Sequence, residues 1–141
     1  TDYKESDEQK EKAAIQPFLN VTMASRGKAT RGFSLGKSKE DKKKQLQVNV
    51  NIKNIGNGFA NTLVVHTGAN YGGLAFNNVI AVGESIDLFF MVDEDELKEG
   101  LHFGIQYIDS MRNEYIQEYD MKKEYSSIKI ECGYPGFLEQ F

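Results

Sequence analysis

The chain has 141 residues, of which 40% are hydrophobic and 11% aromatic, and this supports one domain with a core of its own. Its formal net charge of −4 argues against a dedicated nucleic-acid binder, because such proteins usually carry an excess of basic residues. The single cysteine, Cys132, cannot form an internal disulfide, which favours a reducing compartment. No apolar stretch approaches the roughly 18 residues that a transmembrane helix needs.

Residues 1–14 have alternating charges, good helix formers and no apolar face, so we expect a solvated helix or a linker. Gln16-Pro17 ends this segment, because the residue before a proline is disfavoured in the α region. The chain starts at Thr1 without an initiator methionine. We therefore expect a segment upstream of it, with room for a signal peptide or a membrane anchor.

A first strand is predicted from Ile15 to Ser25, and residues 26–44 then form a long loop. The loop holds eight basic and two acidic residues, and the basic ones are Arg26, Lys28, Arg31, Lys37, Lys39, Lys42, Lys43 and Lys44. Two interpretations stay open. The loop is either a solvated connection, or a basic surface for an anionic partner, which we expect to be a protein rather than a specific nucleic acid.

The clearest pattern in the chain is a strict alternation that predicts a half-buried strand. Its apolar residues are Leu46, Val48, Val50 and Ile52, and its polar residues are Gln47, Asn49, Asn51 and Lys53. Residues 54–58 follow this strand, and their glycines and asparagines are expected to supply the positive φ angles of a tight turn.

Further strands are predicted in chain order at residues 62–67, 74–80, 86–90, 101–107, 114–121 and 127–131. Residues 93–100 predict one acidic helical turn closed by Gly100, and residues 109–113 predict a hairpin connection. Short strands with frequent turn signals, and no amphipathic helix among them, predict an all-β fold. We expect an antiparallel Ig-like β-sandwich of about seven to eight strands over residues 15–141, preceded by the charged helix or linker of residues 1–14.

Three stretches of the sequence resemble one kind of domain. N-I-G-N-G-F-A-N at residues 54–61 resembles the NxGxGxA turn of Ig-like bacterial domains, and E-K-A-A-I-Q-P-F-L at residues 11–19 resembles their N-terminal lead-in. Y-I-D-S-M-R-N-E-Y at residues 107–115 is similar to their YxDxxGNxY hairpin, with Arg112 where the pattern prefers glycine. The resemblance implies that the glycines shape the turn and that Ala60 packs below it. It also implies a membrane-tethered bacterial module without an assigned activity.

Copper is the sharpest chemical alternative, because C-G-Y-P-G-F-L at residues 132–138 resembles the cysteine loop of blue-copper proteins. Such a site needs two histidines and one cysteine, with a weak axial methionine or its equivalent. Phe137 stands where the ligand histidine is required, and neither His66 nor His102 lies in this loop. We therefore expect no cofactor, and Cys132 is interpreted as a small hydrophobe at the end of a strand.

The acidic residues between positions 93 and 99 raise the question of calcium. An EF-type loop needs a glycine at position six and a glutamate at position twelve, but counting from Asp93 places Lys98 and Gly104 there.

No GxSxG motif marks a nucleophile, and carboxylates such as Glu114 and Glu118 are expected to discourage edge-to-edge strand pairing. We therefore expect that the chain is not an enzyme.

Six of the seven tyrosines lie in the second half of the chain: Tyr71, Tyr107, Tyr115, Tyr119, Tyr125 and Tyr134. Tyr115 and Tyr119 lie four apart in a predicted strand, so they face the same side and form a candidate platform for a sugar or another small ligand. The alternative is that the tyrosines occupy half-buried strand positions, where one end of the side chain is apolar and the other is wet.

The preferred function is a non-catalytic Ig-like module of a membrane-tethered bacterial protein, which mediates a protein interaction. A carbohydrate- or small-ligand-binding sandwich is the alternative. The lack of disulfides and the lysine-rich loop favour the cytoplasmic side of the membrane, and an extracytoplasmic position stays open. The sequence leaves the oligomeric state undetermined.

Overall fold

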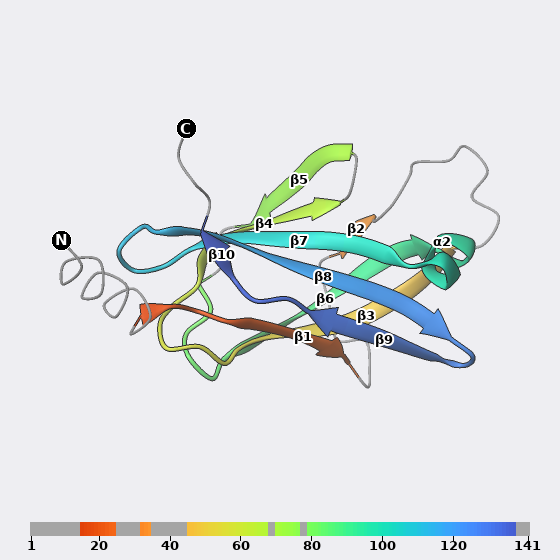
Figure 1. Cartoon of the computed structure of the whole chain (residues 1–141), viewed down its shortest axis with the longest axis horizontal. Helices are drawn as coiled ribbons and strands as arrows, with labels where there is room; N and C mark the ends of the chain where they lie inside the picture. The colour runs from red at the N-terminus through yellow and green to blue at the C-terminus, as the bar shows by residue number, and fades with distance from the viewer. Residues whose placement is uncertain (1–14, 25–31, 35–44, 68–69, 77–78, 138–141) are drawn as a thin grey trace, which may run out of the picture.

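A computed structural model of the chain describes residues 15–24, 32–34, 45–67, 70–76 and 79–137 (Figure 1). In this part of the chain two β-sheets pack face to face as a sandwich, and one short helix lies at one end. The predicted all-β sandwich is therefore confirmed. Eight of the described strands have five residues or more and two are shorter, which agrees with the predicted number.

The first sheet has four strands in the order β1–β3–β6–β2. Their bounds are Leu19–Met23 for β1, Gln45–Asn54 for β3, Ser85–Asp93 for β6 and Gly32–Ser34 for β2. The neighbours β1, β3 and β6 are antiparallel, and the short β2 runs parallel to β6. β3 and β6 form the central pair of this sheet. Their antiparallel register runs from Gln45 opposite Asp93 to Lys53 opposite Ser85.

The second sheet has six strands in the order β10–β8–β7–β4–β5, with β9 also paired to β8. Their bounds are Asn61–Thr67 for β4, Asn70–Phe76 for β5, Leu101–Ile108 for β7, Glu114–Glu124 for β8, Ser127–Cys132 for β9 and Gly136–Phe137 for β10. The strand predicted at residues 74–80 in fact starts at Asn70, and Ile80 makes only an isolated bridge with Ala60. The sequence pattern does not reveal where this strand starts, because glycines and asparagines are disfavoured in strands and weaken the local signal.

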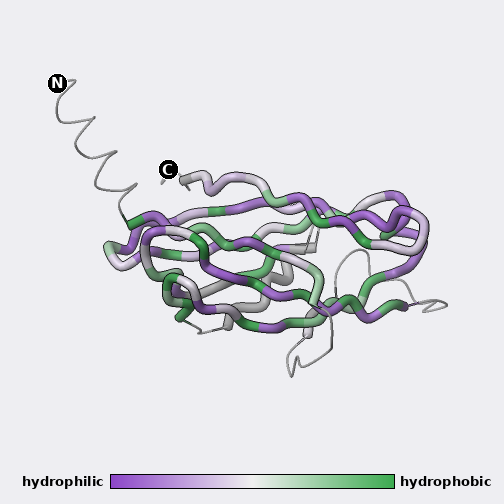
Figure 2. The backbone as a smooth tube through the Cα atoms, turned by 90° about the horizontal axis from the view of Figure 1, so that it is seen from below, coloured by the Kyte–Doolittle hydropathy of each residue, from purple (hydrophilic) through white to green (hydrophobic). Residues whose placement is uncertain are grey.

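The core lies between the two sheets and follows the alternation seen in the sequence. Val48, Val50 and Ile52 of β3 are buried, whereas Gln47 and Lys53 are exposed. Hydrophilic and hydrophobic segments alternate along the backbone tube, in purple and green (Figure 2). Burying one such aliphatic side chain stabilises the fold by about 1.5–3 kcal/mol, so the period-two pattern of β3 determines which of its faces packs inward.

Aromatic rings join the two sheets across the core. Phe90 of β6 lies 5.1 Å, between ring centroids, from Phe103 of β7, and Phe103 stacks on Tyr119 of β8 at 5.0 Å. All three side chains are fully buried. Because such ring pairs add about 0.5–1.5 kcal/mol beyond their buried area, this column holds the sheets in one relative position.

The outer edge of β1 is held by side chains of the other sheet. The amide of Leu19 donates to Oε1 of Gln117 at 3.0 Å, and the hydroxyl of Tyr119 donates to the Leu19 carbonyl at 2.7 Å. One step further along, the amide of Val21 donates to Sγ of Cys132 at 3.4 Å. Cys132 ends β9, as predicted, and it is half-buried. The backbone groups of Leu19 and Val21 on this edge therefore already have hydrogen-bond partners and are not available for pairing with another strand.

Candidate interaction surface

Asn54, the last residue of β3, organises the loops at one end of the sandwich. Its side chain is fully buried, and Nδ2 donates to the carbonyls of Gly58 at 2.7 Å and Ile80 at 2.8 Å. Its Oδ1 accepts from the amide of Gly56 at 3.0 Å. Through these hydrogen bonds Asn54 holds the β3–β4 loop against the β5–β6 loop.

The glycines of this turn have a different role from the expected one. A Cβ atom at Gly56 would clash with the backbone of Phe18, and one at Gly58 would clash with the carbonyl of Ile15. The positive φ angles in the described chain lie elsewhere, at Gly83, Gly100, Arg112 and Tyr125. The expectation of positive φ at residues 54–58 is therefore wrong, because these glycines allow close packing of the N-terminal lead-in. Ala60 is fully buried, as the resemblance implied.

Asp109 organises the neighbouring β7–β8 hairpin in the same way. Its Oδ1 accepts from the amides of Met111 at 2.8 Å and Asn113 at 2.9 Å, and its Oδ2 accepts from the Tyr115 hydroxyl at 2.7 Å. Burial raises the pKa of Asp109, but the hydrogen bonds from Tyr115 and Asn113 outweigh it and hold this pKa below its usual value. The carboxylate is thus a fixed acceptor, and it makes the hairpin rigid.

Most of the large hydrophobic residues that are exposed in the described part of the chain lie on these loops. Five of eight lie on them, each 51–72% exposed: Ile55, Phe59, Val79, Val82 and Met111. A sixth, Tyr134, is 88% exposed in the connection from β9 to β10, where its ring meets that of Phe18. Backbone hydrogen bonds join residues 54–57 to residues 16–18 and 80–84, and Asn61 pairs with Ile108 at the base of the hairpin. The six residues therefore share one end of the sandwich, on the left in Figure 1, which we call the apolar loop end.

A shallow depression of about 340 Å³ lies at the apolar loop end, open to solvent. Its lining is formed by Gln16, Pro17, Phe18, Ile55, Gly56 and Asn57. The ring of Phe18 meets that of Tyr134 edge-on, with 6.0 Å between their centroids. Gly56, whose lack of a side chain permits its close approach to Phe18, thus forms part of the depression.

Much of the apolar loop end comes from a long stretch of sequence without charged residues. None of the 17 basic and 21 acidic residues of the chain falls between Asn54 and Gly83, a run of thirty residues. Four of the six exposed apolar residues lie in this run. Large contiguous apolar patches are rare on monomeric proteins, so the exposed apolar residues of this run make the end a candidate interaction surface. This signal is visible in the sequence as a run of uncharged residues, although it is not a recognised motif.

The structure leaves the predicted basic surface untested. All eight of its residues lie outside the described residues. The chain rejoins the described structure at Gln45, which pairs with Asp93 at the end opposite the apolar loop end. The charged helix or linker predicted for residues 1–14 also lies outside the described residues.

The structure corrects the predicted ligand platform. Tyr115 and Tyr119 do face the same side of β8, but that side is the core, and both side chains are fully buried. Tyr115 stacks on Tyr107 at 5.5 Å between centroids, and Tyr119 stacks on Phe103. Burial raises the pKa of all three tyrosines, so their hydroxyls remain protonated hydrogen-bond donors. Neither ring face of the predicted pair is open to a sugar.

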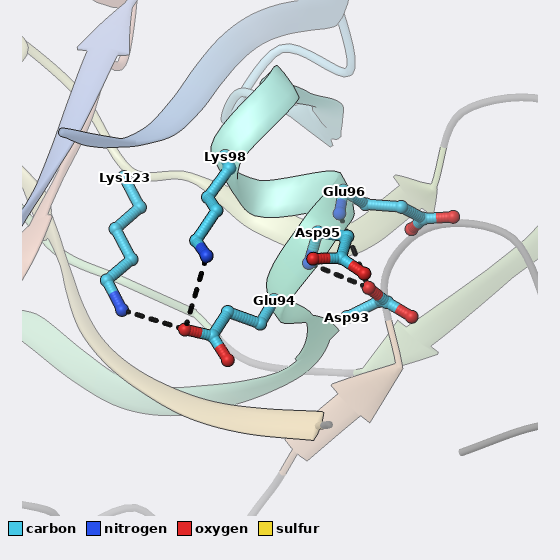
Figure 3. Close-up of polar contacts among 6 residues, drawn as sticks. All are labelled: Asp93, Glu94, Asp95, Glu96, Lys98 and Lys123. Atoms are coloured by element: carbon cyan, nitrogen blue, oxygen red, sulfur yellow. Dashed lines mark hydrogen bonds and ion pairs between the residues drawn. The ribbon is translucent and has the colours of Figure 1, made fainter. Parts of the chain in front are cut away.

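The acidic segment forms the predicted helical turn, helix α2, from Glu94 to Glu99 (Figure 3). Asp93 caps it, since its Oδ1 accepts from the amides of Asp95 at 2.8 Å and Glu96 at 3.4 Å. Glu94 pairs with Lys123 at 3.2 Å and with Lys98 at 3.9 Å (Figure 3). Capping therefore accounts for the carboxylate of Asp93, and ion pairs account for that of Glu94.

The histidines and the cysteine lie in separate settings. His66 contacts Gln106 at 2.9 Å, whereas His102 contacts Asp120 through Nδ1 at 2.9 Å and Glu118 through Nε2 at 3.5 Å. The hydrogen bond to Asp120 raises the pKa of His102. Within the described residues no group of three or more histidine, cysteine or acidic side chains is arranged to hold a metal ion. Both ring nitrogens of His102 are taken up by carboxylates.

No protein-family model, curated protein or solved structure matches the chain. The comparisons therefore identify no family, and the resemblance at residues 54–61 and 107–115 stays a prediction. Among the described helices, none is both long and apolar enough to cross a bilayer.

Proposed function

We propose that the chain is a non-catalytic Ig-like module that binds a protein partner through its apolar loop end. The order of the strands supports the Ig-like assignment. β1, β3 and β6 are neighbours in one sheet, and β8, β7, β4 and β5 are neighbours in the other. Immunoglobulin domains place their strands A, B and E in one sheet and G, F and C in the other, with C′ beside C in variable-type domains.

The exposed apolar side chains of the loop end carry the proposal. Aromatic residues and methionine are enriched at the centres of protein interfaces, and Phe59, Met111 and Tyr134 supply them here. Beneath them, the buried side chains of Asn54 and Asp109 fix the loops. A preordered surface loses little conformational entropy on binding, so these contacts can contribute fully to affinity.

The membrane tether is part of the same proposal, and the similarity of residues 11–19 to a domain lead-in supports it. Residues 1–14 join the described structure at Ile15, which lies at the apolar loop end. A tether would thus attach at the end that bears the exposed apolar residues. Fractionation of cells that make the full gene product tests it: the protein should sediment with membranes, and its recovery in the soluble fraction would rule the tether out.

Site-specific photo-crosslinking tests the interaction surface. A photo-reactive phenylalanine placed at Phe59, in the cells that natively make the protein, should give one discrete adduct with a protein identifiable by mass spectrometry. Tyr125 is the matched control, because it is fully exposed in the β8–β9 turn at the other end of the sandwich. Ile55→Asp should abolish the Phe59 adduct, because it places a charge in the apolar surface.

Three results of this experiment would contradict the proposal. Equal adducts at Phe59 and Tyr125 would show that the loop end has no preference over the rest of the surface. Adducts with lipid alone would assign the loop end to the bilayer. Adducts with a second copy of the chain alone would assign it to self-association.

A further inference from the structure

The outer face of the first sheet carries a row of carboxamide side chains. Alternate residues of β3 are buried in the core, so Gln47, Asn49 and Asn51 point outward. The outward residues of β6 that the register places directly opposite them are Met91, Phe89 and Asp87. We call these six residues the amide face. None of them belongs to the apolar loop end.

The amide face is nearly free of charge, unlike the outer face of the second sheet. Its one charged side chain is that of Asp87. The outward residues of β8 and β9 include five exposed charged side chains: Glu118, Asp120, Lys122, Lys129 and Glu131. The amide face instead combines neutral hydrogen-bonding groups with two apolar side chains. Charge complementarity therefore favours an uncharged ligand for this face.

Two hydrogen bonds hold the polar side chains of the amide face in place. Nδ2 of Asn51 donates to Oδ1 of Asp87 at 2.9 Å, and Nε2 of Gln47 donates to Oδ1 of Asn49 at 3.2 Å. A carboxamide has both donor and acceptor atoms. Among the described residues these bonds leave Oδ1 of Asn51 and Nδ2 of Asn49 unused. A ligand that both donates and accepts hydrogen bonds, as a sugar hydroxyl does, matches this pair.

The ring of Phe89 lies against the sheet beside these carboxamides. β2 pairs with β6 so that Gly32 is the neighbour of Phe89. A Cβ atom at Gly32 would meet three consecutive ring carbons of Phe89 almost equally closely, so one face of the ring covers this glycine. The other face is turned away from the sheet, and Phe89 is accordingly half-buried. An outward aromatic face attracts the C–H groups of a sugar ring, because the face of the ring is electron-rich.

We propose that the amide face binds a neutral oligosaccharide. Phe89 stacks on one sugar ring, and Asn49 and Asn51 form hydrogen bonds with its hydroxyls. Asn49 lies directly opposite Phe89 in the register, so one sugar can make both kinds of contact. The outward side chains from Gln47 to Asn51 span roughly 13 Å along the extended strand, which gives room for a short stretch of a polysaccharide.

Affinity electrophoresis of the whole chain tests the proposal. Native gels are cast with laminarin, xylan, galactomannan, soluble starch or hydroxyethyl cellulose as neutral probes, and with alginate as an acidic one. We expect at least one neutral polysaccharide to retard the chain relative to a gel without polysaccharide. Isothermal titration with oligosaccharides of that polysaccharide then measures the affinity.

Two variants assign the binding to the amide face. Phe89→Ala removes the stacking ring and should weaken binding at least about tenfold. Because this ring also covers Gly32, Asn49→Ala is the second variant: it breaks only an exposed contact with Gln47, so it should fold normally and still bind at least about tenfold more weakly. Gln106→Ala is the matched control, since it removes a carboxamide from the outer face of the second sheet and should leave binding unchanged.

Four results would overturn the proposal. Retardation by none of the five neutral polysaccharides would show that the face binds no such sugar. Retardation by alginate alone would assign the ligand to anions. Retardation that persists in Asn49→Ala would place the sugar elsewhere, and retardation lost in Phe59→Asp would place it at the apolar loop end. Phe59→Asp should otherwise abolish capture of the protein partner alone, so failure of this proposal and failure of the proposed function are told apart.

Discussion

The hydroxyl of Tyr119 donates a hydrogen bond of 2.7 Å to the carbonyl of Leu19, and this bond ties the edge of one sheet to the face of the other. Both residues are fully buried. Tyr119→Phe leaves the Leu19 carbonyl without this donor, so we expect a loss of about 1–2 kcal/mol in the free energy of unfolding. Urea denaturation measures it. Tyr125→Phe removes an exposed hydroxyl and should leave the midpoint unchanged; equal effects of the two changes would contradict the role of the Tyr119 bond.

Asn54→Ala should destabilise the fold more strongly. It removes the side-chain donor of the Gly58 and Ile80 carbonyls and the acceptor of the Gly56 amide, and of these three groups only the Ile80 carbonyl keeps another protein partner, the amide of Ala60. We expect a loss of about 2–4 kcal/mol by denaturation. Asn49→Ala, in the same strand, breaks only an exposed contact with Gln47 and should cost under about 0.5 kcal/mol. A small effect at Asn54 would show that the loop end does not depend on it.

Arg112→Gly should stabilise the β7–β8 hairpin. Arg112 has a φ of 63°, a left-handed conformation that costs most side chains about 1–2 kcal/mol and costs glycine almost nothing. After the greater chain entropy of glycine in the unfolded state is subtracted, we expect a gain of about 0.5–1 kcal/mol. Met111→Gly, one residue earlier and without a positive φ, should lower stability. A loss at Arg112→Gly would show that the arginine side chain makes a contribution of its own.

His102 predicts a pH dependence of stability. Its pKa is raised by the hydrogen bond to Asp120, with a further contribution from Glu118, so the folded state prefers the protonated ring. Its stabilising contribution is therefore fully present below the unfolded pKa of about 6.5 and is lost as the pH rises through the higher folded pKa. Denaturation midpoints of the wild-type chain and His102→Gln should differ most at acidic pH and converge at alkaline pH. A constant difference would contradict the coupling.

The sequence predicts the parts of the fold that depend on local pattern. Strand β3 is found because its apolar residues recur every second position, and helix α2 because a run of acidic residues ends at Gly100. It is harder to predict from the sequence which face of a strand packs into the core. The spacing of Tyr115 and Tyr119 places them on one side of β8, and only the charges at Glu118 and Asp120 on its other side indicate that the tyrosine side is the core.

The remaining features depend on contacts between distant parts of the chain. The bonds from Gln117, Tyr119 and Cys132 to β1 join residues about a hundred positions apart, and no local pattern encodes them. The apolar loop end is assembled from several loops and becomes visible only once these loops are brought together. Its one sequence signal is the charge-free run from Asn54 to Gly83.

The most direct test of the central claim measures affinity for the partner captured at Phe59. Isothermal titration with the purified partner should show that the double variant Ile55→Ser and Phe59→Ser binds at least about tenfold more weakly, which corresponds to about 1.4 kcal/mol. Both residues are half-exposed, so the variant should unfold at the same urea concentration as the wild-type chain. Unchanged affinity in this variant, with a loss in Tyr125→Ser at the opposite end, would contradict the account.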